Sequence, residues 1–137
     1  MAKFSETFKK YNPRDEAQWK TWNGAEFLIA PTGNKHQQQM MLEEFTLQEA
    51  SEFESKGPMV FSGLRAGEAL KRVYSLYSKS IIFDWKLEDD NDKPMKFTPE
   101  KCLQLMTENL EFSNWVLVTS QEIAIEKNKA EEALEKK

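Results

Sequence analysis

The stretch from Val73 to Asn128 constrains the fold of this chain more than any other part of the sequence. It contains an apolar stripe at helical spacing that ends at Asp84 and Trp85, then an acidic turn, a helix start and a long charged helix. Each of these parts has a structural use, and none resembles a group of catalytic side chains. The stretch therefore predicts a small helical packing unit.

The apolar stripe begins upstream and predicts one central helix over residues 64–85. Its apolar side chains recur every three or four residues, at Ala66, Ala69, Leu70, Val73, Tyr74, Tyr77, Ile81 and Trp85. The alternative is a strand at residues 81–83, because β-branched residues cluster there. The unbroken helical period through Trp85 favours the helix.

The strongest local signal in the chain is the pair Asn23-Gly24. Residues 18–22 and 25–29, on either side of the pair, are rich in β-forming side chains. Asn and Gly both tolerate positive φ angles, so the pair predicts a two-residue type I′ turn and a β-hairpin over residues 17–30.

In that register Trp22 lies opposite Ala25, and Trp19 lies opposite Leu28. An isolated hairpin is only marginally stable, so this one must pack on something. We expect it to pack on helices of its own chain, and docking on a neighbouring molecule is the alternative.

Turn residues at positions 31–34 separate the hairpin from a predicted helix over residues 35–45. The spacing of Thr46 and Glu49 fits a capping box and predicts that a helix restarts there. Lys56, Gly57 and Pro58 then predict a break.

A second strong helix start lies at residues 97–100. Thr98 supplies a capping side chain, Pro99 suits the first helical position, and Glu100 lies near the positive end of the helix dipole. Ser113 predicts a further N-cap, with a final helix from Asn114 onward.

Both ends of the chain are polar. Residues 1–16 form a predicted N-terminal arm, in which Phe4, Phe8 and Tyr11 lie at helical spacing before Pro13 ends any helix. The C-terminal end, residues 126–137, is highly charged and has little apolar surface. We expect it either to fray or to pack against another chain.

Composition restricts the classes of function. The 137 residues hold 23 acids and 19 bases, for a net charge of −4, so a broad basic surface for nucleic acid is not expected. No window of 18 apolar residues predicts a membrane span, and the N-terminus has no apolar core typical of a signal peptide. Cys102 is the only cysteine and is expected in the core.

The acidic turn has the partial spacing of an EF-hand calcium loop, starting at Asp89 and ending at Glu100. Lys93 and Pro94 would then occupy the fifth and sixth positions, where the loop needs a ligand and a glycine. The only histidine, His36, is expected at the surface. We therefore predict no metal, no cofactor and no enzymatic activity.

Several of these parts occur in the same order in one viral family. The segment GAEFLIAPTGNKHQQQ follows a Trp, SIIFDWKLEDDNDKPMKFTPEKCLQLM comes next, and the end is rich in Glu, Lys and Asn. This order resembles the tail assembly chaperones of long-tailed bacteriophages. The residues that carry the resemblance are Trp19, Asp84, Trp85, Phe97, Thr98, Pro99 and Glu100. The chain departs from the pattern at Asp92-Lys93, where a glycine is usual.

The resemblance implies a mainly α-helical single domain, residues 17–137, that begins with the short hairpin. It also implies a non-enzymatic protein of the host cell cytoplasm that self-associates, covers the tape-measure protein and helps recruit tail-tube subunits. Neither nucleic acid nor membrane is an expected partner. The alternative is a structural tail or head–tail adaptor protein that stays in the virion. Candidate contact residues are Phe4, Phe8, Tyr11, Ile123 and Ile125.

Overall fold

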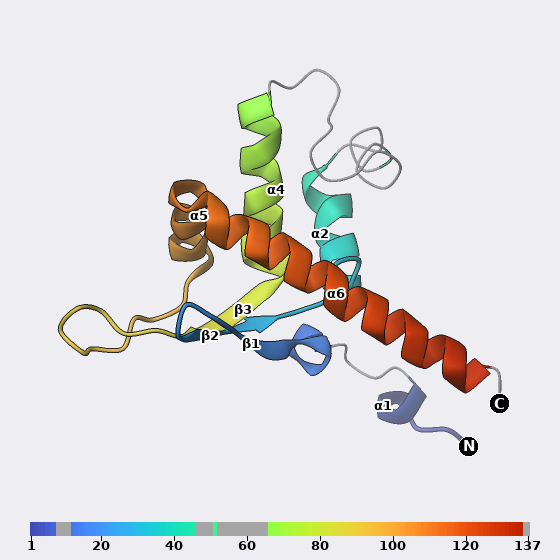
Figure 1. Cartoon of the computed structure of the whole chain (residues 1–137). Helices are drawn as coiled ribbons and strands as arrows, with labels where there is room; N and C mark the ends of the chain where they lie inside the picture. Colours follow the sequence, from blue (N-terminus) through green and yellow to red (C-terminus); the bar gives the residue numbers. More distant parts are fainter. Residues whose placement is uncertain (8–11, 46–50, 52–65, 136–137) are drawn as a thin grey trace.

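The computed structural model describes residues 1–7, 12–45, 51 and 66–135 (Figure 1). Its elements follow in the order α1 (Phe4–Thr7), the 3₁₀ helix η1 (Pro13–Glu16), β1 (Gln18–Trp22), β2 (Ala25–Ile29), α2 (Lys35–Glu44), α4 (Ala66–Ser80), β3 (Ile82–Lys86), α5 (Pro99–Glu108) and α6 (Leu110–Glu135). The three strands form one antiparallel sheet of order β1-β2-β3. The predicted fold class, mainly α with an N-terminal hairpin, is confirmed.

The hairpin has the predicted turn and register. Asn23 has φ 48° and Gly24 has φ 82°, as a type I′ turn requires at both central positions. Trp22 pairs with Ala25 and Trp19 pairs with Leu28. The hairpin packs on α6 of its own chain, which confirms the favoured alternative.

The predicted central helix is wrong in its last part. α4 ends at Ser80, and residues 82–86 form strand β3, which pairs with β2. A β-bulge explains the misleading period: Ile82 pairs with Ile29 and Asp84 pairs with Leu28, so one extra residue lies between them. In a regular strand, Ile82 and Trp85 would point to opposite faces. The bulge lets both be buried, at 0% and 5% exposure.

The start of α5 is as predicted, because Thr98 is its N-cap and the Thr98 Oγ1 accepts a 3.1 Å hydrogen bond from the Lys101 N–H. The start of the last helix is corrected. α6 begins at Leu110, so Ser113 lies inside the helix. The buried Ser113 hydroxyl donates to the carbonyl oxygens of Met106 and Asn109 instead of capping a helix.

The core lies between the sheet and the helices. α6 crosses the sheet and contacts β1 and β2, while α4 contacts α2, α5 and β3 (Figure 1). One stripe of α6 is buried, at Phe112, Ser113, Val116, Thr119, Ser120 and Ile123. Cys102 is fully buried, as predicted. No helix in the described ranges is long and apolar enough to cross a membrane.

In the N-terminal region, Pro13 begins η1, whose N-cap is Asn12. η1 is joined to the rest of the domain by two ion pairs, Arg14 with Asp84 at 3.4 Å and Glu16 with Lys127. Residues 13–16 therefore rest on both β3 and α6.

At the other end, α6 continues as a helix to Glu135. In the single chain, the side chains from Asn128 to Leu134 are exposed. The predicted helix restart at residues 46–49 and the break at residues 56–58 lie outside the described residues.

Candidate interaction site

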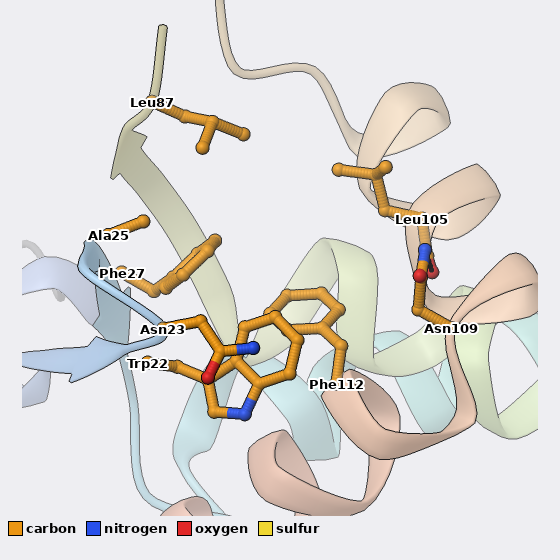
Figure 2. Close-up of a pocket in the computed structure, with 8 residues that line it drawn as sticks. All are labelled: Trp22, Asn23, Ala25, Phe27, Leu87, Leu105, Asn109 and Phe112. Atoms are coloured by element: carbon orange, nitrogen blue, oxygen red, sulfur yellow. Dashed lines mark hydrogen bonds between the residues drawn. The ribbon is translucent and has the colours of Figure 1, made fainter.

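A hollow of about 190 Å³ lies between the tip of the hairpin and the corner where α5 meets α6 (Figure 2). From the hairpin it is lined by Trp22, Asn23, Ala25 and Phe27. From the other side it is lined by Leu87, Leu105, Asn109 and Phe112. Figure 2 shows Leu87 and Leu105 pointing toward each other across it. We call this space the hollow.

The hairpin side of the hollow is set by the type I′ turn. The turn places Trp22 and Ala25 opposite each other, and Phe27 follows on the same face of β2. The Trp22 and Phe112 ring centroids are 5.3 Å apart, and those of Phe27 and Phe112 are 5.0 Å apart. Phe27 and Phe112 are each 3% exposed, so these rings form a fixed wall.

The other side depends on the α5–α6 corner. Asn109 ends α5, and both its backbone N–H and its side-chain Nδ2 donate to the Leu105 carbonyl oxygen, at 3.0 and 2.9 Å. These bonds satisfy a helix end that would otherwise be unpaired. They also hold Leu105 and Asn109 at the mouth of the hollow.

The residues that line the hollow carry no charge. Glu26 and Lys86 stand next to lining residues in the sequence, and they pair with each other at 3.4 Å. An uncharged, mainly apolar space suits an apolar group of another molecule.

The residues that carry the family resemblance have structural roles outside the hollow. Trp85 is buried and packs edge-on against Phe97, with ring centroids 4.9 Å apart. Asp84 accepts from the Trp85 N–H at 2.9 Å and pairs with Arg14. Thr98, Pro99 and Glu100 form the first turn of α5.

Trp19 lies on the opposite face of the sheet from the hollow and is 38% exposed. The Lys86 ammonium stands over its ring, 4.5 Å from the centroid. Trp19 is therefore not part of the core. His36, expected at the surface, is partly buried, and its ring lies 6.0 Å from that of Phe83.

The candidate contact residues that the structure describes, Phe4, Ile123 and Ile125, differ widely in exposure. Phe4 on α1 is 78% exposed, whereas Phe8 and Tyr11 lie outside the described residues. Ile123 is only 2% exposed and belongs to the core, so it has no surface to offer a partner. Ile125 is 53% exposed and points away from that core.

Sequence reasoning missed two surfaces. One is the hollow, whose lining comes from separate elements. The other is an exposed apolar strip on α6 made of Leu110, Val118 and Ile125, which are 61%, 50% and 53% exposed. We call it the outer strip of α6. The seven-residue spacing of Val118 and Ile125 could have revealed it, because residues two helical turns apart share a face.

Two titratable groups of the core have raised pKa values. Burial raises the pKa of the Cys102 thiol to about 12, so the thiol is protonated and unreactive at neutral pH. Burial also raises the pKa of Tyr77, whose hydroxyl lies 3.1 Å from the Thr32 Oγ1. Within the described residues, no group of three or more His, Cys, Asp or Glu side chains is placed to hold a metal ion. The arrangement supports apolar contact with another molecule.

A family model described as YdaY prophage protein matches residues 29–137, most of the chain. No curated protein and no solved structure was found to match.

Proposed function

The chain belongs to the YdaY prophage protein family, and from this premise we propose that it is a phage tail assembly chaperone. In this role it covers the apolar tape-measure protein in the host cytoplasm, associates with further copies of itself and helps recruit tail-tube subunits. It acts by temporary contact and catalyses no reaction.

The observation that carries this proposal is the outer strip of α6. Val118 and Ile125 are about half exposed, on the side of the helix opposite Val116 and Ile123, which are buried. A small protein that exposes an apolar strip along a long helix has a surface suited to another apolar helix. The prophage family and the order of sequence motifs make the tape-measure protein the proposed partner.

Charge supports a temporary coat. The net charge of −4 keeps separate copies soluble while apolar strips are covered. The strip itself is narrow, so each single contact is weak, and many copies along one long partner would bind through their combined contacts. Weak contacts would also let tail-tube subunits displace the coat.

The test is co-expression with the tape-measure protein encoded by the same prophage. We expect the full chain to keep that protein soluble and to elute with it. The double variant Val118→Ser/Ile125→Ser should lose this effect, while Gln121→Ser, on the same exposed side of α6, should retain it. An insoluble tape-measure protein in the presence of the unaltered chain would refute the proposal.

Mass spectrometry of purified particles separates this role from that of an adaptor. A chaperone should be absent from finished virions or present only in traces. Stoichiometric amounts of the chain in the virion would instead establish a structural tail or head–tail adaptor.

A further inference from the structure

We propose that, when no tape-measure protein is bound, two copies of this chain pair their α6 helices antiparallel and cover each other's outer strip. This inference rests on the proposed function, because it names a second copy as the first occupant of the strip that the tape-measure protein would later take. Every side chain that carries it belongs to the described part of α6.

One row of exposed side chains runs along the side of α6 that faces away from the core. Val118 and Ile125 are 50% and 53% exposed, and Glu122, Lys129 and Ala133 are exposed as well. These residues follow one another at intervals of three or four, so they share one side of the helix. From Val118 to Ala133 the row is about 22 Å long, at 1.5 Å of rise per residue.

A second helix has access to this side of α6. The opposite, buried side of α6 packs in the domain, and the helix crosses the sheet and continues beyond it (Figure 1). A helix laid along the exposed row therefore meets no strand of the sheet.

The charges of the row are complementary about its centre. Glu122 lies three residues before Ile125, and Lys129 lies four residues after it. Among the described residues, neither the Glu122 carboxylate nor the Lys129 ammonium forms an ion pair within its own chain. The row thus presents an apolar centre with an acid on one side and a base on the other.

Charge decides how two such rows pair. In a parallel two-fold pair, Glu122 faces Glu122 and Lys129 faces Lys129, so like charges repel at both places. In an antiparallel pair with the two Ile125 side chains beside the two-fold axis, Glu122 of each copy faces Lys129 of the other. Val118 then faces Ala133, and two ion pairs flank a central apolar contact. The row is therefore complementary to a second copy of itself in the antiparallel direction.

This contact is closed and weak, as a temporary cover requires. Both copies use the same surface, so a third copy has no equivalent place to add. Pairing removes the exposed side chains of Val118 and Ile125 from water in both copies. The contact is narrow, and ion pairs near a surface contribute little to affinity. A long apolar partner that offers many contacts can then displace one copy.

The first experiment measures the mass of the full chain by light scattering after size exclusion, over a series of concentrations. The unaltered chain should pass from monomer to dimer and grow no further. Because the contact is two-fold, Lys129→Glu places two pairs of acids face to face and should weaken association by about tenfold or more. Lys71→Glu, at an exposed position of α4, is the control with the same change of charge and should associate as the unaltered chain does.

A mixing experiment tests the pairing of the charges. Glu122→Lys and Lys129→Glu should each remain monomeric at concentrations where the unaltered chain is dimeric. An equal mixture should form dimers, because each altered row then faces a row of opposite charge. The double variant Glu122→Lys/Lys129→Glu should associate on its own. A mixture that stays monomeric, although both single variants melt like the unaltered chain, would overturn the proposal.

Cysteine cross-linking tests the direction of the helices. The thiol of Cys102 is fully buried, so cysteines introduced on the row should react first under mild oxidation. Val118→Cys chains mixed with Ala133→Cys chains should form a disulfide-linked dimer, and neither variant should do so alone. Linkage of Val118→Cys chains to one another would indicate a parallel pair and overturn the proposal.

An unaltered chain that stays monomeric at every concentration would also overturn this inference. The chaperone role would then still be decided by the solubility of the co-expressed tape-measure protein, which does not depend on pairing between free copies.

Discussion

The indole Nε1 of Trp85 donates a 2.8 Å hydrogen bond to the carbonyl oxygen of Met95. This bond joins β3 to the segment that leads into α5, across the acidic turn. The Asp89 side chain orders that turn by accepting from the N–H groups of Asn91 and Lys93, at 2.8 and 3.1 Å. Trp85, one of the residues that carry the family resemblance, is thus part of the core.

Trp85→Phe should test this bond. The change keeps a ring against Phe97 but leaves the Met95 carbonyl without its donor, which should lower the free energy of unfolding by about 1–3 kcal/mol. Chemical denaturation followed by circular dichroism measures the loss. Trp19→Phe is the control and should change stability by less than about 0.5 kcal/mol, because Trp19 is partly exposed. Equal losses in the two variants would show that the bond contributes nothing.

Replacing each tryptophan by alanine should make the difference between their contributions to stability larger. Trp85→Ala should cost about 3–5 kcal/mol, because it leaves a cavity in the core. Trp19→Ala should cost about 1 kcal/mol, since it loses a partly exposed ring and the contact with the Lys86 ammonium. Thermal melts of the two variants should differ clearly, and a larger loss for Trp19→Ala would contradict the assignment of the two sheet faces.

At Gly24, the positive φ angle and not the surrounding space should make a larger residue unfavourable. A Cβ added at Gly24 would meet no atom within 4 Å, yet its φ of +82° is unfavourable for an alanine. Gly24→Ala should therefore destabilise the fold by about 1–2 kcal/mol. Gly67→Ala is the matched control, because it also meets no atom but lies in α4, and it should stabilise by up to about 1 kcal/mol. Equal losses of unfolding free energy in the two variants would contradict the view that the positive φ angle at Gly24 causes the destabilisation.

Ser113 should matter because its hydroxyl connects two helices. Ser113→Ala removes the donor to the Met106 carbonyl oxygen at the end of α5 and should lower stability by about 1–3 kcal/mol. Thr107→Ala removes a bond within α5 only, from the exposed Thr107 hydroxyl to the Leu103 carbonyl oxygen. We expect the smaller loss there, measured by urea denaturation, and the reverse order would contradict this role.

The Cys102 thiol should make stability fall at high pH. Its pKa rises from the ordinary value of 9.0 to about 12 in the fold, so the folded protein keeps the proton while the unfolded chain loses it. Stability is therefore fully present below pH 9.0 and is lost progressively toward pH 12. Melting curves of the unaltered chain should decline more over this range than those of Cys102→Ala. Tyr77 titrates in the unaltered chain and in the variant, so the difference between their melting curves reports the ionisation of the Cys102 thiol. A thiol reagent that modified the folded protein rapidly at neutral pH would contradict its burial.

The candidate interaction site was largely beyond sequence reasoning. Its lining comes from the hairpin, the segment after β3, α5 and α6, and the sequence gives no sign that these meet. By contrast, the motif residues Trp85 and Phe97 were recognisable in sequence because their positions in the pattern are fixed, although their mutual packing was not.

The sequence by itself determined the features whose energy is local. Asn23-Gly24 imposes its turn through two positive φ angles, and Thr98-Pro99 begins α5 through a cap and a fixed φ. Only the tertiary structure decided that residues 82–86 form a strand. Their side-chain period fits a helix, but β2 offers unpaired backbone groups, and a bulge lets both Ile82 and Trp85 reach the core. Strand pairing depends on a partner more than fifty residues away in the chain, and neither the partner nor the bulge can be read from local spacing.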